Sequence, residues 1–306
     1  MKIQKNILLK DYTTFKIGGA AEFFAEVNNT IELQEVLQWA GDNNKQIFVL
    51  GGGSNLLVSD DGIKGLVIKL NLNDLEIEGN KVRVGSGVSL TYLLNETLEN
   101  DLVGLDFVTG IPGTVGGAIR GNAGTYGQDM SRVVKTIKYI DDQYKVVEIS
   151  ADKAKFAYRH SMFKESKYII VEAGLELKHG NVEEVRKLIK ERLAYRHETQ
   201  PHRPSAGCIF KNVKFEDVDI KDLEKRHLDL SRFANHKKIP VGYLIEEAGL
   251  KGHTIGDAQI SEKHGNYIIN KSNATAEQVI MLISFIKQQI RDKYGIQLIE
   301  EVQIII

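Results

Sequence analysis

The sequence contains two glycine-rich segments whose main chain is suited to binding an anion. The longer one, residues 110–127, has seven glycines in eighteen positions. The shorter one, Leu50-Gly-Gly-Gly-Ser-Asn55, follows the apolar segment Ile47–Leu50, which is typical of a strand that ends in a phosphate-binding turn. Glycine lacks a Cβ atom, so it adopts positive φ without strain and lets backbone N–H groups approach an anion. Two such segments predict a cofactor with a diphosphate, although turns that only connect strands also explain each segment alone.

Four other segments combine glycine or polar residues with a reactive side chain. They are Tyr158–Ser161, Ser205–Asn212, Gly256–Tyr267 and Glu300–Val302. Each has an ordinary structural explanation as well: an ion pair for Arg159, packing of a small apolar group for Cys208, and solvation for Glu301. The sequence has no His-Glu-x-x-His, Cys-x-x-Cys, Gly-x-Ser-x-Gly or Walker motif, so we expect neither a metal site nor a hydrolase of those types.

The composition is that of an ordinary folded protein. Hydrophobic residues make up 42% of the 306 residues, charged residues 26%, and the net charge is −1. A nearly neutral chain is not generally attracted to nucleic acid or membranes, so a charged ligand must be met by local clusters. Cys208 is the single cysteine, which excludes an internal disulfide and fits a reducing compartment. The start lacks a signal peptide and no apolar run is long enough to span a membrane, so we expect a soluble cytoplasmic protein.

Hydrophobic periodicity predicts alternating strands and helices in the first hundred residues. Strands are expected at 21–27, 47–50, 67–70 and 81–84, with helices after Asn29 and from Ser89. The middle of the chain is β-rich, with strands at 133–140, 145–149 and 168–177. A helix is then expected from Asn181 to about Arg196, and residues 197–204 break regular structure and mark the main domain boundary.

The last hundred residues predict a smaller mixed unit. We expect a short strand at 208–213, a helix at 241–248, a helix capped by Thr275 and Gln278, and a final strand at 298–306. A Rossmann site is not predicted: Gly85-Ser-Gly87 precedes a helix, but Leu90 occupies the position of the third glycine and no acidic residue downstream completes the fingerprint.

Seven motifs that follow one another along nearly the whole chain point to a known family. They are Thr14-Phe-Lys-Ile-Gly-Gly19, Leu50-Gly-Gly-Gly-Ser-Asn-Leu-Leu57, Gly110-Ile-Pro-Gly-Thr-Val-Gly-Gly117, Tyr158-Arg-His-Ser161, Ala206-Gly-Cys-Ile-Phe-Lys-Asn212, Gly242-Tyr-Leu-Ile-Glu-Glu-Ala-Gly-Leu-Lys-Gly252 and Ala258-Gln-Ile-Ser-Glu-Lys-His264. Together they resemble the UDP-N-acetylenolpyruvoylglucosamine reductases, the MurB family of peptidoglycan precursor synthesis. The compact spacing between Arg159 and Cys208 is similar to the shorter, type II form.

The resemblance implies an α+β fold with two domains. The first is a FAD-binding domain of the type shared with vanillyl-alcohol-oxidase-like (PCMH-like) proteins, expected at 1–195 with subdomains at about 1–75 and 76–195. The second is a smaller α+β substrate-binding domain, expected at 196–306. Neither glycine-rich segment holds a histidine or cysteine for covalent attachment, so the FAD is expected to be noncovalent.

The FAD pyrophosphate is expected to lie on the two glycine-rich segments, because their oriented N–H groups meet its charge in a chain of nearly zero net charge. The expected cofactor-binding residues are Gly51, Gly52, Gly53, Ser54, Asn55, Gly110, Gly113, Thr114, Gly116, Gly117 and Asn122.

By resemblance, NADPH is the hydride donor, FAD carries the hydride, and C3 of the enolpyruvyl group of UDP-N-acetylglucosamine enolpyruvate receives it, which gives UDP-N-acetylmuramate. Arg159 is implied to pair with the substrate carboxylate, Cys208 to donate a proton to C2, and Glu301 to meet the enol-like intermediate, as acid or as electrostatic stabiliser. Contacts to the nucleotide-sugar substrate are expected from Tyr158, Lys211, Asn212, Lys263 and His264.

The sequence departs from the family pattern at three positions. Cys208 stands where serine is usual, which changes the acid but not the plan of the reaction. Glu300 replaces a common proline. Thr199 stands where many relatives have lysine, which puts one phosphate contact in doubt, and Arg196 or Arg203 is a candidate to replace it.

Two other functions remain open from the sequence. A FAD-dependent oxidase would use the same flavin fold, but the motifs after residue 195 argue against it. A non-catalytic nucleotide-sugar or flavin-binding protein would keep the glycine-rich segments without needing Arg159, Cys208 and Glu301 together. We expect a monomer that binds no nucleic acid.

Overall fold

The computed structural model describes residues 2–235 and 237–305, which form two compact units interleaved along the chain. Unit 1 holds the residues up to Ile7, Ala21–Gly52 and Lys64–Glu198. Unit 2 holds Leu8–Ala20, Gly53–Ile63 and the chain from Thr199 onward. Two short early segments thus belong with the C-terminal hundred residues. The FAD-binding and substrate-binding domains expected on either side of residue 195 stay predictions.

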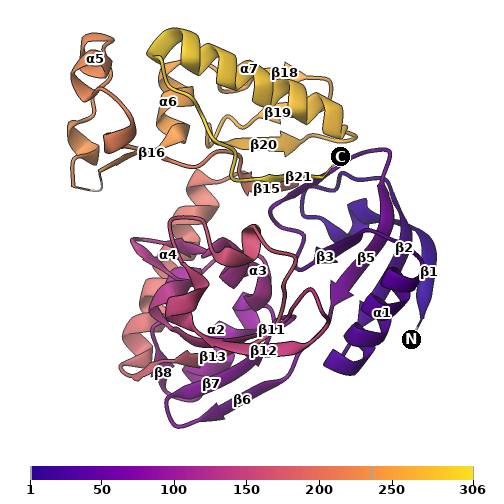
Figure 1. Ribbon diagram of the computed structural model, residues 1–306. Helices are drawn as coiled ribbons and strands as arrows, with labels where there is room; N and C mark the ends of the chain where they lie inside the picture. Colours follow the sequence, from indigo (N-terminus) through magenta and orange to yellow (C-terminus); the bar gives the residue numbers. More distant parts are fainter. Residues whose placement is uncertain (1, 236, 306) are drawn as a thin grey trace. The chain divides into compact units, whose positions relative to one another are not determined.

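The first sheet of unit 1 has the strand order β1-β2-β5-β3, with α1 beside it (Figure 1). Its elements are β1 Ile3–Leu8, β2 Ala20–Val27, β3 Ile47–Leu50, β5 Ile63–Leu70 and α1 Thr30–Asp42. The helix begins where it was expected, because the Asn29 side chain accepts a hydrogen bond from the N–H of Glu32. Its apolar face, which includes Leu33 and Leu37, packs with Leu66 and Ile68 of β5 in one core cluster.

The second sheet of unit 1 is antiparallel, with the order β12-β11-β13-β7-β6. Its strands are β6 Leu75–Glu78, β7 Lys81–Gly85, β11 Val134–Ile140, β12 Val146–Ser150 and β13 Ile169–Glu176. Three helices accompany it: α2 Leu90–Glu99, α3 Val115–Gly121 and α4 Val182–Thr199. Leu93 of α2, Ile119 of α3 and Ile137 of β11 share one core, whereas α4 buries no residue fully. Two short pairs complete the unit, β8 Leu102–Val103 with β14 Lys178–His179 and β9 Gly124–Thr125 with β10 Gln128–Asp129.

Unit 2 is built on a sheet of order β15-β20-β19-β18, along which the long helix α7 lies (Figure 1). Its elements are β15 Ser205–Cys208, β18 Thr254–Ile255, β19 Ala258–Ile260, β20 Tyr267–Asn270, α6 Val241–Glu247 and α7 Ala276–Tyr294. A capping box of Thr275 and Gln278 starts α7, as expected, and Val279, Ile283 and Ile290 are buried.

Smaller elements of unit 2 bring together distant parts of the chain. They are β4 Leu56–Val58, β21 Gln303–Ile305, β16 Val213–Lys214, β17 Lys238–Ile239 and α5 Ile220–Lys225. Strands β21 and β4 pair in parallel, and Phe15, Ile17 and Leu57 belong to the same core as α7. None of the helices described combines the length and apolar character that a membrane crossing needs.

Four elements differ from the sequence-based expectation. Helix α3 lies inside the glycine-rich stretch that was expected to be a loop, because Thr114 caps it and burial of Val115, Ala118 and Ile119 outweighs the low helix propensity of glycine. Helix α4 continues to Thr199, so the predicted break begins too early.

The expected strand at 208–213 is wrong as a single element: β15 ends at Cys208 and β16 starts at Val213. Between them, both backbone groups of Phe210 bond to the side chain of Asn266 instead of continuing a strand ladder. The final strand is limited to β21, and residue 306 lies outside the described residues.

Candidate functional site

The two glycine-rich segments meet in unit 1. A Cβ atom on Gly52, in the turn after β3, would lie 2.6 Å from the Cα of Gly113, and one on Gly51 would lie 3.0 Å from the Oγ1 of Thr114. Real Cβ atoms do not approach a backbone atom as closely as 2.6 Å, so the main chains are in contact because residue 52 is glycine. The pair of segments therefore forms one main-chain surface.

This surface offers hydrogen-bond donors and a positive charge. Within the part of the chain that the structure describes, no residue accepts a hydrogen bond from the N–H of Gly52, Gly113 or Thr114. The ammonium group of Lys69 on β5 donates to the carbonyl oxygen of Gly51 at 2.5 Å, and burial lowers the pKa of this lysine. Unused amides, contacts too close for a Cβ atom and a nearby cation fit the predicted pyrophosphate of FAD.

Other predicted cofactor residues have a packing role. The N–H of Gly116 donates to the carbonyl of Ser86 at 2.9 Å, and a Cβ atom there would lie 2.8 Å from the Cβ of Ser86. Gly117 donates to Thr114 at 3.5 Å, and a Cβ atom on Gly110 would meet the Cδ of Arg196 at 2.7 Å. Neighbouring protein atoms thus crowd a Cβ position at Gly116 and Gly110, whatever binds nearby, whereas one at Gly117 would make only an ordinary contact of 3.7 Å with Thr114.

The shorter segment also enters unit 2. Gly53 has φ +64°, and a Cβ atom there would collide with the carbonyl oxygen of Tyr12. Ser54 and Asn55 follow in the same unit, and the Asn55 side chain donates to the carbonyl of Glu301 at 3.1 Å. Part of the predicted cofactor segment therefore holds the backbone of a predicted catalytic residue.

Tyr158 and Arg159 form the tip of a tight turn in unit 1. The flanking residues Ala157 and His160 exchange backbone hydrogen bonds of 3.0 and 3.1 Å. Arg159 has φ +54°, in the left-handed region that is costly for a residue with a side chain. Its guanidinium lies over the Tyr158 ring, 5.4 Å from the centroid. The remaining predicted residue nearby, Asn122, is buried and bonds to Ala157 and Ser131.

Cys208 and Glu301 are carried by neighbouring backbone segments of unit 2. Cys208 pairs with Tyr267 at the end of β15. The next residue, Ile209, accepts a hydrogen bond from the N–H of Glu301 at 2.7 Å. The N–H of Lys211 donates to Ile299 at 2.9 Å, which ties the two segments a second time. The structure thus brings together the segments of the predicted proton donor and the predicted glutamate.

His264 lies on the turn that supports this pair of segments. Its Nδ1 accepts from the N–H of Asn266 at 3.2 Å, and its ring meets the Tyr267 ring edge-on at 4.9 Å. Burial lowers the pKa of His264, which favours a neutral ring with the proton on Nε2. Lys263 lies next to it, and its N–H donates to Ser261 at 3.2 Å. Asn212 accepts from the N–H of Val241 at 3.3 Å, at the start of α6.

The residues at the departures from the family pattern have defined contacts. Glu300 forms an ion pair with Lys287 of α7 at 2.7 Å. Arg196 donates to the carbonyl of Gly110 at 3.2 Å, and Arg203 donates to Lys271 at 3.0 Å. Arg196 and Gly110 lie in unit 1 and Arg203 in unit 2, so the two candidates to replace the missing lysine are built into different units.

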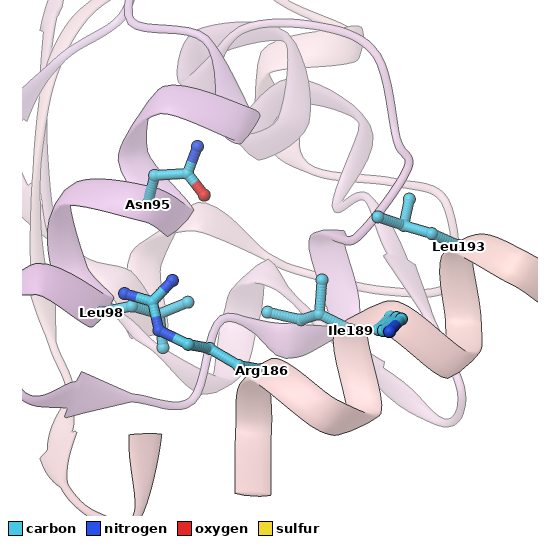
Figure 2. Close-up of a pocket in the computed structure, with 6 residues that line it drawn as sticks. Asn95, Leu98, Arg186, Ile189 and Leu193 are labelled. Atoms are coloured by element: carbon cyan, nitrogen blue, oxygen red, sulfur yellow. The ribbon is translucent and has the colours of Figure 1, made fainter. Parts of the chain in front are cut away.

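A shallow groove of about 250 Å³ lies between α2 and α4 (Figure 2). It is lined by Asn95, Leu98, Arg186, Ile189, Lys190 and Leu193. Arg186 is ion-paired with Glu99 at 2.5 Å. None of the predicted site residues lines this groove, so we assign it no part in the predicted chemistry.

Sequence reasoning missed two residues that shape the site. Asn266, which is 2% exposed, forms two side-chain hydrogen bonds to Phe210, at 2.9 and 2.8 Å, and accepts from Ile209 through its own carbonyl. In the sequence, Asn266 could have been noticed as a polar residue between a glycine and a strand, within the segment Gly256–Tyr267 that was already singled out. Lys69 was also missed, and its signal was a charged residue within the apolar run Val67–Leu70.

The chain is similar to known proteins over nearly its whole length. Residues 200–305 match the family model described as UDP-N-acetylenolpyruvoylglucosamine reductase, C-terminal domain, and residues 21–150 match an FAD binding domain. The UDP-N-acetylenolpyruvoylglucosamine reductase of Caldanaerobacter subterraneus is 38% identical over 99% of this chain and 94% of its own length. The reductase of Anoxybacillus flavithermus is 40% identical over the same shares of the two chains.

A solved structure agrees with the sequence relatives. The crystal structure of UDP-N-acetylenolpyruvylglucosamine reductase (MurB) from Thermus caldophilus covers all of this chain and all of its own, with 31% identity and a TM-score of 0.80. The α+β fold class expected from the sequence is confirmed. Because the likeness extends over both units and the full length, the chain belongs to the UDP-N-acetylenolpyruvoylglucosamine reductase (MurB) family.

Proposed function

We propose that this protein is a FAD-dependent, NADPH-oxidising reductase that converts UDP-N-acetylglucosamine enolpyruvate to UDP-N-acetylmuramate in peptidoglycan precursor synthesis. The observation that carries the proposal is the joining of the Cys208 and Glu301 segments through the 2.7 Å bond at Ile209, in a chain similar to reductases over 99% of its length. The protein acts in the cytoplasm as a monomer.

When bound, FAD supplies hydride transfer between NADPH and C3 of the enolpyruvyl group. The main chain at Gly52, Gly113 and Thr114, with Lys69, binds its pyrophosphate. In the turn of unit 1, Arg159 binds the substrate carboxylate, on which negative charge develops. The thiol of Cys208 donates a proton to C2. Glu301 interacts with the developing enol, as acid or as electrostatic stabiliser.

The nucleotide-sugar is bound by residues around these groups. Tyr158 supports Arg159 through its ring, and Lys211, Lys263 and Asn212 supply charge and polar contacts in unit 2. His264, kept neutral by burial, donates through Nε2 to the substrate.

Anaerobic flavin spectroscopy tests the function and separates it from its alternatives. The purified protein should be yellow, NADPH should bleach it under argon, and UDP-N-acetylglucosamine enolpyruvate should restore the colour. A flavin that NADPH does not bleach would indicate a binding protein, and colour restored by oxygen but not by substrate would indicate an oxidase. Acid denaturation should release the flavin, because neither glycine-rich segment contains a histidine or cysteine to hold it covalently.

A matched glycine pair tests the cofactor site without measuring turnover. Gly52→Ala should lose most of its bound flavin, because the new Cβ atom would lie 2.6 Å from the Gly113 Cα. Gly121→Ala is the control, since nothing lies within 4 Å of its Cβ position, and it should keep the wild-type ratio of flavin to protein. Equal flavin content in the two variants would contradict the placement of the pyrophosphate.

A further inference from the structure

The turn that carries Arg159 is attached to the end of α3 by a buried asparagine. Asn122, which follows the last residue of α3, is 2% exposed. Its Nδ2 donates to the carbonyl of Ala157 at 3.0 Å, and its Oδ1 accepts from the N–H of Ser131 at 3.1 Å. Both ends of the side-chain amide are therefore used inside unit 1. Such a fixed amide is suited to holding backbone in place.

The bond from Asn122 reaches the turn at its hinge. Ala157 and His160 close the turn with two backbone hydrogen bonds, so the carbonyl of Ala157 accepts from both His160 and Asn122. Tyr158 and Arg159 lie between them, and Arg159 is the residue with φ +54°. A conformation that is unfavourable for arginine persists only where surrounding contacts hold it.

Two further bonds brace the same turn. Ser161, which is fully buried, donates through Oγ to the carbonyl of Arg120 on α3 at 2.8 Å. The ammonium group of Lys164 donates to the carbonyl of Arg159 itself at 2.9 Å. Two of the three braces thus come from the end of α3, the helix that Thr114 of the predicted cofactor segment caps at its start.

We propose that Asn122 is a positioning residue for Arg159: it fixes the Ala157–His160 turn to the end of α3, and thereby aims the guanidinium at the substrate carboxylate. This inference rests on the proposed function, because it needs Arg159 to act on a carboxylate. It differs from the role that the sequence predicted for Asn122, contact with the cofactor. Helix α3 then links the predicted pyrophosphate segment, at its start, to the turn of the carboxylate-binding arginine, at its end, within one unit.

The test is the variant Asn122→Asp, which keeps the shape and the acceptor for Ser131 but turns an oxygen toward the Ala157 carbonyl. Under argon, stopped-flow spectroscopy follows flavin reduction by NADPH and reoxidation by UDP-N-acetylglucosamine enolpyruvate separately. We expect normal flavin content and normal reduction by NADPH. Reoxidation should be slower by about 10- to 100-fold at subsaturating substrate, since misplacing a positioning group by about 1 Å costs that much.

A control separates positioning from a general loss of stability. Asn80 also donates to a backbone carbonyl in unit 1, to Leu177 at 3.3 Å, and it belongs to no predicted site. Asn80→Asp should leave both half-reactions at the wild-type rate. If Asn122→Asp releases flavin, the side chain holds the cofactor and our inference fails. If it reoxidises at the wild-type rate, the inference also fails.

A double-mutant cycle gives the readout that a purely structural role would not move. In an Arg159→Ala background, Asn122→Asp should slow reoxidation by less than about 3-fold, because the group that it positions is gone. Full additivity would overturn the inference. Should Asn122→Asp not fold, Lys164→Met removes another brace of the same turn. We expect slower reoxidation by the substrate and unchanged reduction by NADPH. An unchanged rate of reoxidation would contradict the inference. Wild-type protein that is not reoxidised by this substrate would instead overturn the proposed function.

Discussion

Arg159 in unit 1 and Cys208 in unit 2 are held by backbones of different kinds. Each lies at an irregular point of the chain with a positive φ nearby. In unit 2 the positive φ falls on Gly207, at +76°, where a left-handed conformation costs little. In unit 1 it falls on Arg159 itself, at +54°. The tip of this turn thus carries an arginine at a position where the backbone favours glycine, as expected if the predicted role of Arg159 keeps it there.

The two backbones also differ in how they are supported. The turn of Arg159 depends on side chains, namely Asn122, Ser161 and Lys164. The segment after Cys208 is tied by backbone bonds to the chain near Glu301, and Asn266 adds a two-bonded clamp at Phe210. We infer that losing one side-chain bond disturbs the direction of Arg159 more readily than it disturbs Cys208. The four predictions below test this difference.

The largest effect is expected from Cys208, the predicted proton donor in unit 2. A cysteine thiol is a far stronger acid than a serine hydroxyl, so it donates a proton more readily. Because general acid catalysis contributes about 10²- to 10⁴-fold, Cys208→Ala should slow flavin reoxidation by the enolpyruvyl substrate by a factor in that range. Reduction by NADPH needs no such proton and should stay normal, and Cys208→Ser should keep substantial activity. Wild-type reoxidation by the alanine variant under argon would show that Cys208 only fills space.

The Asn266 clamp of unit 2 should matter more for the stability of the fold than for the direction of the Cys208 side chain. Asn266→Ala would leave the buried N–H and C=O of Phe210 without their partners, at about 1–3 kcal/mol of unfolding free energy each. Urea unfolding should therefore show a loss of about 2–6 kcal/mol. Asn43→Ala removes a bond of 2.8 Å at an exposed helix end and should cost less than about 1 kcal/mol. Similar losses in the two variants would show that the Cys208 segment does not depend on its clamp.

Glycine at the tip of the turn tests the strain in unit 1. Arg159→Gly removes a left-handed arginine, whose conformation costs about 1–2 kcal/mol, but adds about 0.5–1 kcal/mol of unfolded-state entropy. We expect a midpoint of thermal unfolding equal to or slightly above the wild-type value, together with loss of substrate-dependent reoxidation. Lys155→Gly, at φ +51° on an exposed residue, should give the same thermal result with normal activity. A clear drop in the unfolding temperature of Arg159→Gly alone would mean that the arginine stabilises its turn.

The smallest expected effect concerns His264 in unit 2. Burial lowers the pKa of this histidine in the folded state, whereas the unfolded chain titrates near the ordinary value of about 6.5. Above that value both states are neutral and the histidine adds no pH dependence. As the pH falls below it, the unfolded state binds a proton that the folded state resists, so stability decreases. His264→Asn, which keeps an acceptor for Asn266, should make the unfolding temperature fall less steeply between pH 7 and pH 5; an unchanged slope would contradict the assignment.

Sequence reasoning succeeded where the signal was local. The helix starts at Asn29, Ser89 and Thr275 were predicted from capping residues followed by apolar periodicity, and the structure has a side-chain cap at each of them. Helix α3 was missed because its glycines argue against a helix, and only burial against the core reverses that preference. Helix propensities taken from the local sequence do not account for such burial.

The candidate site was predictable as a set of residues but not as a geometry. Resemblance to the family selected Arg159, Cys208 and Glu301 as the reactive set, and their roles stay predictions. The supporting roles of Asn266 and Asn122 could not be recognised from the sequence, because these residues differ from other asparagines only in the groups that lie next to them after folding. The link from Asn55 to Glu301 joins positions near opposite ends of the sequence, which no local pattern can indicate.

The interleaving of unit 2 has a consequence for how the protein is made on the ribosome. Its early segments, which supply β4, Phe15, Ile17 and Leu57, are synthesised long before β21 and α7, with which they share a sheet or a core. Apolar residues of these segments have to wait without their final partners until the last part of the chain emerges, which favours capture by chaperones or by other nascent chains. A fragment beginning at Thr199 would lack both segments, so unit 2 cannot be obtained by a single cut.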